Sequence, residues 1–397
     1  MRRDRPGKVI AGRYELLEPA GEGGMAVVWR AVARGAGRFA RPVALKRIHA
    51  SKGADRHMVK LFEEEARVGA ALHHPNIVQI LDFGVDDDGD YFLAMEWVDG
   101  LDLHQWARSY PRGIEPTPWP LVTAIGAEVL RGLGAAHERI DEQGQLSPVF
   151  HRDVSPSNVL LGTNGTAKLT DFGLARAMDR ASMTRPNVIK GKLAYCAPEL
   201  ITGAKASAQS DLFALGVVLW EALAQQRLFT GDNDLEVLLA VRKGDIPRLG
   251  ELRSDVPAAL EVAIHQALEP DPKDRFEDAK SMARALAAIL RSHPEPVDAE
   301  PVGRSVAQAR ERLGLSRAAR EDGAGAEKDG AGAEKGEASV QDLSLSEVEV
   351  VEGAEPSALE IEVSVQDVAV PPEVSPETAG SEPVRGLWAD ESERDDE

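Results

Sequence analysis

The chain has 397 residues, 43% of them hydrophobic, which is enough for a packed core without disulfides. Its single cysteine, Cys196, excludes an intramolecular disulfide and a thiolate metal site, and indicates a reducing, cytoplasmic location. The net charge of −20 comes almost entirely from residues 321–397, where 23 Asp and Glu face 4 Lys and Arg, so it argues against a nucleic-acid partner only for that segment.

The first residues, Met1–Ile10, are basic but lack the apolar region and cleavage site of a secretory signal. The longest apolar stretch, near Phe213–Trp220, is far shorter than the roughly 20 residues that span a bilayer. We therefore expect residues 1–12 to be an N-terminal extension and the chain to have no membrane span.

Residues 13–98 alternate short β-rich runs with turns around one helical pattern, Ala54–Leu72. The acidic segment Asp86–Asp90 predicts a hairpin turn. The predicted strands are Arg13–Pro19, Met25–Ala33, Pro42–His49, Ile77–Phe83 and Tyr91–Val98. Together these elements predict a small, mostly β lobe.

From Leu101 to Arg291 the pattern becomes mainly helical. The predicted helices are Val122–His137, Asp211–Ala224, Leu235–Val241, Val256–Leu268 and Phe276–Leu290. The fold class is therefore α+β, with an N-terminal lobe at 13–98 and a helical lobe at 101–291. A cleft between two such lobes is where a ligand is expected.

After Arg291 we expect a linker, residues 292–320, with a possible short helix at Ser305–Arg320. Residues 321–397 are acidic, low in aromatics and repetitive, which predicts a disordered tail. Two alternating runs, Leu343–Val351 and Leu359–Val365, could form strands on a partner, although solvated coil is the better interpretation. The tail could recruit substrates, inhibit the chain, bind a regulatory protein or simply improve solubility.

Three segments could build a phosphate site. Gly21–Gly24 lies between the first two strands, where glycines let backbone N–H groups approach phosphate, although a plain turn also fits. Lys46 ends the apolar run Val43–Lys46, and the following helix carries Glu63–Glu65. Alone, the lysine could snorkel and the glutamates could form a solvated face. In this order they can hold ATP phosphates through an oriented ion pair.

The segments His151–Asn158 and Asp171–Gly173 make the argument decisive. Phosphoryl transfer needs a carboxylate that accepts or orients the hydroxyl, together with oxygen ligands for Mg²⁺. Asp153, Asn158 and Asp171 supply these groups, and a short hairpin between the segments returns the third beside the first two.

At this point the sequence resembles the eukaryotic-like (Hanks-type) serine/threonine protein kinases of bacteria, over roughly Arg13–Arg291. The matching motifs, in family order, are the glycine loop ending at Val28, VALK at Val43–Lys46, HPN at His74–Asn76, HRDxxxxN at His151–Asn158, DFG at Asp171–Gly173, APE at Ala197–Glu199, DLFALG at Asp211–Gly216 and Arg275. The resemblance implies the bilobal protein kinase fold, ATP and Mg²⁺ as cofactors, and protein substrates.

The resemblance also assigns roles. Lys46 holds the α and β phosphates and pairs with Glu65, Asp153 is the catalytic base, and Asn158 and Asp171 bind Mg²⁺. The implied nucleotide-binding residues are Ala20, Gly21, Glu22, Gly23, Gly24, Met25, Ala26, Val27, Val28, Ala44, Lys46, Glu96 and Val98. Met95 resembles the gatekeeper, Glu96–Val98 the hinge, Glu199 and Arg275 the buried ion pair of the helical lobe, and Asp211 the anchor below the catalytic loop.

Three positions depart from the family pattern. Ala26 replaces the third loop glycine, and Gly69 replaces a bulky residue that helps align the two lobes, so the active arrangement could be less stable. Ser155 replaces the usual catalytic-loop lysine, while Lys192 stands where a threonine is usual. Our hypothesis is that these two positions have exchanged roles and that Lys192 brings the missing positive charge to the phosphate. The alternative is a solvent-facing lysine.

The acceptor is expected to be serine or threonine because Pro156 in the catalytic loop resembles that class rather than tyrosine kinases. Arg152 could bind a phosphorylated activation-segment residue, for which Ser182 and Thr184 are the candidates. The alternative functions are a nucleotide-binding pseudokinase scaffold and a small-molecule kinase. The motif Ala197–Glu199 argues against the latter.

Overall fold

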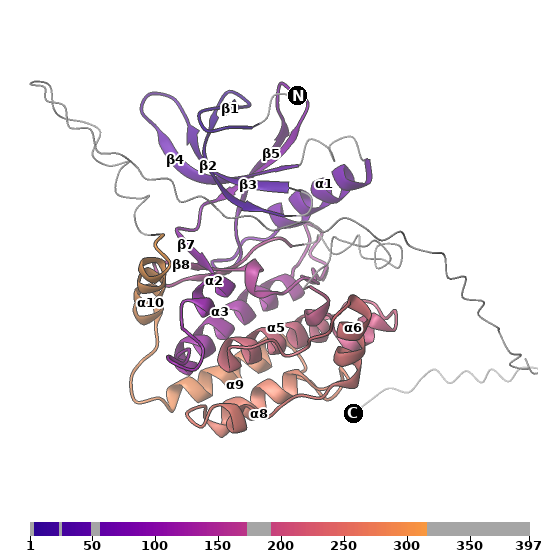
Figure 1. The fold of residues 1–397 in the computed structure, drawn as a ribbon. Helices are drawn as coiled ribbons and strands as arrows, with labels where there is room; N and C mark the ends of the chain where they lie inside the picture. The colour runs from indigo at the N-terminus through magenta and orange to yellow at the C-terminus, as the bar shows by residue number, and fades with distance from the viewer. Residues whose placement is uncertain (1–3, 24–25, 49–55, 173–191, 316–397) are drawn as a thin grey trace, which may run out of the picture. The chain divides into compact units, whose positions relative to one another are not determined.

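An antiparallel sheet of six strands, in the order β1-β2-β3-β4-β6-β5, forms the N-terminal lobe of the computed structural model (Figure 1). Its strands are β1 (Val9–Ile10), β2 (Tyr14–Glu22), β3 (Ala26–Arg34), β4 (Ala40–Ile48), β5 (Ile80–Val85) and β6 (Tyr91–Glu96). The structure describes residues 4–23, 26–48, 56–172 and 192–315. All of them belong to one unit, Met1–Lys328.

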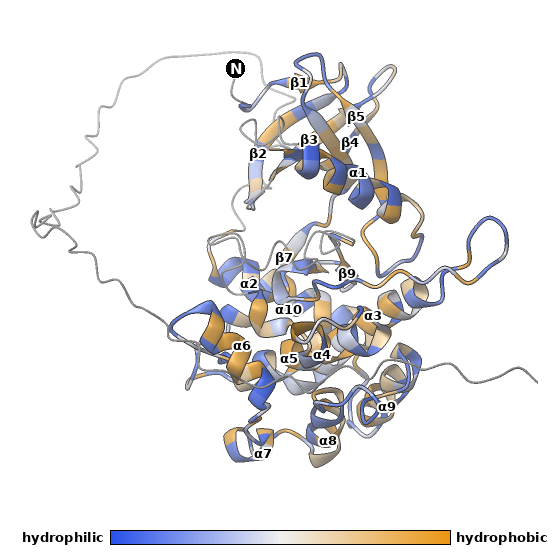
Figure 2. Cartoon of the chain, turned by 90° about the vertical axis from the view of Figure 1, so that its right-hand side faces the viewer, coloured by the Kyte–Doolittle hydropathy of each residue, from blue (hydrophilic) through white to orange (hydrophobic). Residues whose placement is uncertain are grey.

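Side chains on β4 divide between two apolar clusters. Val43 and Leu45 pack with Trp29 in one cluster, whereas Ala44 packs with Phe62 in the other, as alternation along a strand requires. Phe62 belongs to helix α1 (Arg56–Ala70), whose buried residues recur at helical spacing and whose remaining surface is hydrophilic (Figure 2). The helix is thereby held against the strand that carries Lys46.

Residues 4–12, within the predicted N-terminal extension, contact the sheet. β1 pairs with β2, and the N–H of Gly7 donates to the carbonyl oxygen of Leu16 at 2.7 Å. Asp4 reaches the buried Arg47, whose guanidinium also forms an ion pair with Asp86 at 2.8 Å. The first residues therefore complete the sheet, and the predicted turn at Asp86–Asp90 joins β5 to β6.

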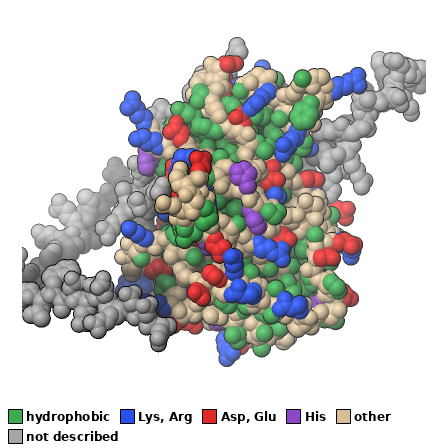
Figure 3. All heavy atoms as spheres, turned by 180° about the vertical axis from the view of Figure 1, so that it is seen from behind, with side chains coloured by type: hydrophobic (Ala, Val, Ile, Leu, Met, Phe, Trp, Pro, Cys, Tyr) green, Lys and Arg blue, Asp and Glu red, His purple; other side chains and the backbone are tan. Residues whose placement is uncertain are grey.

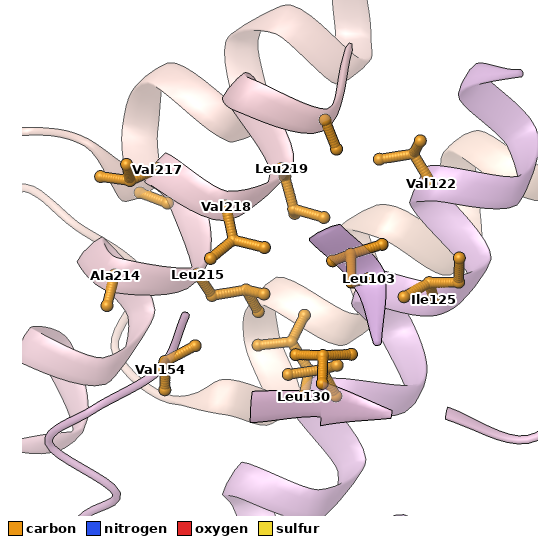
Figure 4. Packing of buried hydrophobic residues seen from close by; sticks show 14 of the residues in the cluster. Leu103, Val122, Ile125, Leu130, Val154, Ala214, Leu215, Val217, Val218 and Leu219 are labelled. Carbon is orange, nitrogen blue, oxygen red and sulfur yellow. The ribbon is translucent and has the colours of Figure 1, made fainter. Parts of the chain in front are cut away.

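Helices dominate the second lobe, which also carries a small antiparallel sheet in the order β7-β8-β9. The helices are α2 (Leu103–Arg108), α3 (Trp119–His137), α4 (Pro198–Ile201), α5 (Ala208–Ala224), α6 (Asp234–Lys243), α7 (Leu249–Leu252), α8 (Ala258–Ala267) and α9 (Ala279–Arg291), and the strands are β7 (Gly100–Asp102), β8 (Val159–Gly162) and β9 (Ala167–Leu169). Figure 4 shows Val122 and Ile125 of α3 packed beside Leu219 of α5.

A further helix, α10 (Ala299–Arg312), packs back on the second lobe (Figure 1). It lies against β7, β8, α2 and α3, and buries Val302, Val306 and Ala309. The Nε1–H of Trp106 in α2 donates to Ser305 Oγ of α10 at 3.1 Å. The helix expected at Ser305–Arg320 thus begins earlier than the sequence indicated, because Pro301 lies in its first turn, where a missing N–H is tolerated.

Several predictions fall on residues that are not described. These include Gly24 and Met25 of the glycine loop, Gly173, the candidate sites Ser182 and Thr184, and the acidic tail at 321–397. Within the described ranges, no helix is both long and apolar enough to cross a membrane.

Candidate active site

Lys46 joins the two lobes through a pair of carboxylates. Its Nζ donates to Glu65 Oε1 of α1 at 2.6 Å and to Asp171 Oδ1 at 2.8 Å. Strand β4 fixes the lysine, and its side chain is only 5% exposed. Three predicted site residues, distant in the sequence, therefore meet at one buried ammonium group.

Burial and charge set the protonation of this group of side chains. Burial raises the pKa of Glu65 to about 8, although Lys46 opposes the shift. Burial alone raises the pKa of Asp171, but the charge of Lys46 and hydrogen bonds with Lys46 and Glu65 together outweigh burial and bring that pKa down to about 2. Burial lowers the pKa of Lys46, whereas the two carboxylates raise it above its ordinary value. Asp171 is thus the carboxylate that holds its negative charge beside a charged lysine.

Asp211 holds the catalytic loop in a strained shape. Its Oδ2 accepts from the N–H of His151 and its Oδ1 from the N–H of Arg152, both at 2.8 Å. Arg152 has a φ of +65°, and such left-handed residues cost about 1–3 kcal/mol. The side chain of Asp211, which also contacts His137 Nε2 at 2.8 Å, therefore stabilises a backbone that is unfavourable by itself.

The bend in the loop brings Asp153 and Asn158 together. The Nδ2 of Asn158 donates to the carbonyl oxygen of Asp153 at 2.8 Å and to its Oδ2 at 2.9 Å. Because the amide nitrogen is used in this way, the Oδ1 of Asn158 is left as the atom that can bind a cation. Asn158 is buried, and the side chain of Asp153, the predicted base, is 12% exposed.

Lys192 contacts the same carboxylate as Asn158. Its Nζ forms an ion pair with Asp153 Oδ2, and its charge also lowers the pKa of Asp171. The side chain of Lys192 is 43% exposed, so it is partly in contact with solvent. Ser155, at the position of the usual lysine, is buried, and its Oγ lies 3.3 Å from Ser157 Oγ. One positive charge therefore contacts the predicted base and acts electrostatically on the predicted metal ligand Asp171.

Apolar side chains of the two lobes meet in one cluster beside the hinge segment. Val28 and Ala44 of the N-terminal lobe share a cluster with Met95, with Val98 of the hinge, and with Leu160 of β8. Apolar walls from both lobes suit a flat aromatic base. Leu160 was missed in the sequence, although its place in the strand following Asn158 could have indicated it.

The glycine loop forms an antiparallel hairpin. Gly21 pairs with Val28, Glu22 pairs with Val27, and Gly23 N–H donates to the carbonyl oxygen of Ala26 at 2.9 Å. Ala26 is 3% exposed and lies in β3, so the position where the family usually has its third glycine belongs to a regular strand here. Ala20 belongs to β2. Gly24 and Met25 lie outside the described residues.

Gly69 faces Ile80 across the interface between α1 and β5. A Cβ on Gly69 would lie 2.8 Å from Ile80 Cγ1, closer than packing allows. Both residues line a cavity of about 10 Å³ that Met95 and Phe172 also border. Ile80 therefore packs directly against Gly69, where a bulkier residue at position 69 would clash with it.

Two further ion pairs support the site. Glu199 and Arg275 form a bidentate pair at 2.8 and 2.9 Å, as the resemblance implies, and the Arg275 side chain is completely buried. Lys168 Nζ donates to Glu96 Oε1 at 2.8 Å and so fixes the first hinge residue. No sequence pattern predicted the contact between Lys168 and Glu96, because a lysine on a short strand is usually exposed.

Comparisons with known proteins agree with this geometry. A family model described as protein kinase domain matches residues 14–287. A tyrosine-protein kinase, MasK of Myxococcus xanthus, is 41% identical over 294 residues, 74% of this chain and 45% of the relative. The serine/threonine-protein kinase PknL of Mycobacterium bovis is 34% identical over 302 residues, 76% of this chain and 72% of the relative.

A solved structure shows the same fold. The kinase domain of PknI from Mycobacterium tuberculosis matches with a TM-score of 0.54 and 28% identity, over 72% of this chain and 99% of that domain. The chain spans less than half the length of MasK, at 45%, and of a probable serine/threonine-protein kinase PknB of Lactococcus lactis, at 42%.

Proposed function

The chain belongs to the protein kinase family, and from that premise we propose that it transfers the γ-phosphate of ATP to serine or threonine hydroxyls of proteins, with autophosphorylation among its reactions. The observation that carries the proposal is the contact of Lys46 with both Glu65 and Asp171. Through these contacts, Lys46 links helix α1 of the N-terminal lobe to Asp171 and is held where it can bind ATP phosphates, which is the arrangement that phosphoryl transfer requires.

Each predicted residue has a role that its contacts support. Lys46 binds the α and β phosphates, and Glu65 keeps its ammonium group in place. Asp153 orients the acceptor hydroxyl and accepts its proton. The apolar residues beside the hinge hold the adenine base.

The oxygen atoms in the cleft suit Mg²⁺. Asp171 is negatively charged. The amide nitrogen of Asn158 donates to Asp153, which leaves the Oδ1 of Asn158 as a possible ligand. Mg²⁺ prefers such oxygen ligands, together with those of the substrate phosphates. Bound there, it would neutralise charge on the transferring phosphoryl group.

We propose that Lys192 carries the positive charge that Ser155 lacks. The ion pair of Lys192 with Asp153 and its influence on Asp171 support this role. Positive charge fixed beside the transferring group stabilises the transition state, and one such contact is typically worth about 10²–10³ in turnover. The lysine thus acts from the activation segment instead of the catalytic loop.

The relatives are described as kinases of different acceptor residues. MasK is described as a tyrosine kinase, whereas PknL is described as a serine/threonine kinase. Pro156, which begins a short 3₁₀ helix in the catalytic loop, favours serine or threonine. A regulatory protein that binds the acidic tail, and a cytoplasmic location, remain proposals that rest on composition alone.

The test is transfer of labelled phosphate from ATP with Mg²⁺ to the chain itself and to a generic basic protein. We expect Asp153→Asn to lower the rate roughly 100-fold or more, because the acceptor hydroxyl loses its base. Asp87→Asn, in the exposed β5–β6 hairpin, is the control and should keep the wild-type rate.

Acid hydrolysis of the labelled products identifies the acceptor. Recovery of phosphotyrosine alone would show that the hydroxyl class is wrong. Nucleotide binding with no transfer by the wild-type chain would favour the pseudokinase alternative.

A further inference from the structure

A second pocket, of about 300 Å³, opens on the helical lobe away from Lys46. Leu103 of α2 and Val218 of α5, both buried in the main core, form its apolar floor (Figure 4). Pro156 lines the same pocket and lies three residues after Asp153. The pocket therefore adjoins the loop that holds the predicted acceptor site.

Basic side chains surround this pocket. Arg108 ends α2, Arg112 follows it, and Arg227 comes from the segment after α5; all three are exposed. His104 is a further exposed lining residue, and Glu221 is the one acidic residue in the lining. Elsewhere basic and acidic side chains are mixed, as Figure 3 shows for one face of the molecule. Because Arg227 pairs with Glu221, Arg108 and Arg112 supply the local excess of positive charge.

The carboxylate of Glu221 is already used within the protein. Its Oε2 accepts from Tyr195 Oη at 2.7 Å and from Arg227 Nη1 at 3.2 Å, and its Oε1 accepts from the N–H of Leu228 at 3.1 Å. The Glu221 side chain is only 9% exposed. A basic ligand would have to break these contacts, whereas an acidic ligand would meet exposed guanidinium groups.

We infer that this pocket, which we call the arginine pocket, binds acidic side chains of the protein substrate next to the residue that is phosphorylated. The inference rests on the proposed function and adds a substrate class to it. Charge complementarity supplies the recognition, because guanidinium groups bind carboxylates in a bidentate manner and attract them over a distance. Pro156 lines the pocket and lies in the same loop as Asp153, so an extended peptide bound at Asp153 would pass close to the arginine pocket.

The test uses the full chain and three peptides that share one serine and differ only in flanking residues, which are Glu, Ala or Lys. Peptide binding is measured by fluorescence anisotropy and phosphorylation by KM and kcat. We expect the wild-type chain to bind the Glu peptide most tightly. The double variant Arg108→Glu/Arg112→Glu should weaken that binding, and raise the KM for that peptide, by roughly tenfold, because two exposed charges contribute about that much.

The control is Arg291→Glu, which reverses an exposed charge at the end of α9, outside the pocket. It should leave all three affinities at the wild-type value. Both variants are checked for an unchanged thermal transition.

Two results would overturn the inference: equal binding of the Glu and Ala peptides by the wild-type chain, or a charge reversal that changes only autophosphorylation. Selective binding of the Glu peptide without any phosphate transfer would instead refute the proposed function and leave the arginine pocket standing.

Discussion

Lys192 and Ser155 form a pair of positions whose exchange can be tested directly. Lys192 contacts Asp153 from the activation segment, while the short side chain of Ser155 reaches only Ser157. Lys192→Ala should lower kcat by about 10²–10³-fold with little change in the KM for ATP, because the charge acts mainly on the transferring phosphoryl group.

The double variant Lys192→Thr/Ser155→Lys restores the usual family arrangement and should recover most of the lost kcat. The matched control is Lys205→Ala, which removes an exposed lysine after α4. Unchanged kcat in Lys192→Ala would show that the lysine merely faces solvent.

Single residues also show where sequence reasoning ends. The predicted site residues could be named because their motifs have a fixed order and spacing. In the structure Lys46 contacts Glu65 and Asp171, and Asn158 contacts Asp153. The close packing of Ile80 against Gly69 could not be predicted, since it depends on how closely α1 approaches β5. The arginine pocket was missed for the same reason, because its basic residues come from separate segments.

At the scale of elements, α10 depends on close contact with the turn between β8 and β9. A Cβ on Gly303 would lie 2.9 Å from the backbone nitrogen of Gly165 and closer still to the carbonyl oxygen of Thr163. The matched kinase domain ends at residue 287, so α10 lies beyond it. Substitutions in α10 can therefore weaken its packing on the second lobe without changing the residues of the family's motifs.

Gly303→Val should destabilise the packing of α10 by about 1–3 kcal/mol, because the larger side chain must push the helix away from the turn. Hydrogen exchange should speed up in α10 and in α2, where Trp106 loses Ser305 as its acceptor. Ala307→Val places the same residue on the exposed face of α10 and is the matched control. Equal exchange rates in the two variants would contradict the predicted role of Gly303.

The two-lobe α+β protein kinase fold predicted from the sequence is confirmed by the family match and the PknI structure. The longer elements were predicted within a few residues, since strands such as β3 and helices such as α5 bury enough side chains to show periodicity. β1 and β7 were missed, because strands of two or three residues are too short for a pattern, whereas the short hairpin expected between Asn158 and Asp171 is formed by β8 and β9.

The stability of the whole molecule should depend on pH through the ion pairs around Arg47. Burial alone raises the pKa of Asp86, but hydrogen bonds from the Asp90 and Asp88 N–H groups, with the charge of Arg47, bring it below its ordinary value. A lowered pKa stabilises the fold above the unfolded-state value of about 3.9, and this contribution is lost as the pH falls through the folded-state value.

Asp86→Asn should therefore lower the free energy of unfolding by about 1–3 kcal/mol at pH 7 and by clearly less near pH 3. Thermal unfolding of the wild-type chain and the variant at both pH values measures the difference. Asp87→Asn, in the same hairpin but exposed, corrects for general acid effects. A difference that does not shrink in acid would rule out this contribution.

The bond between Trp106 and Ser305 joins residues 199 positions apart, and this separation affects the order of events on the ribosome. All strands of the N-terminal sheet lie before residue 97, so every hydrogen-bond partner in that sheet is present early in synthesis. The indole of Trp106 is made soon afterwards, yet its acceptor appears only when almost all of the described chain has been translated. Until then water can accept from the indole in place of Ser305, so the helical lobe gains this buried hydrogen bond only near the end of the synthesis of the described residues.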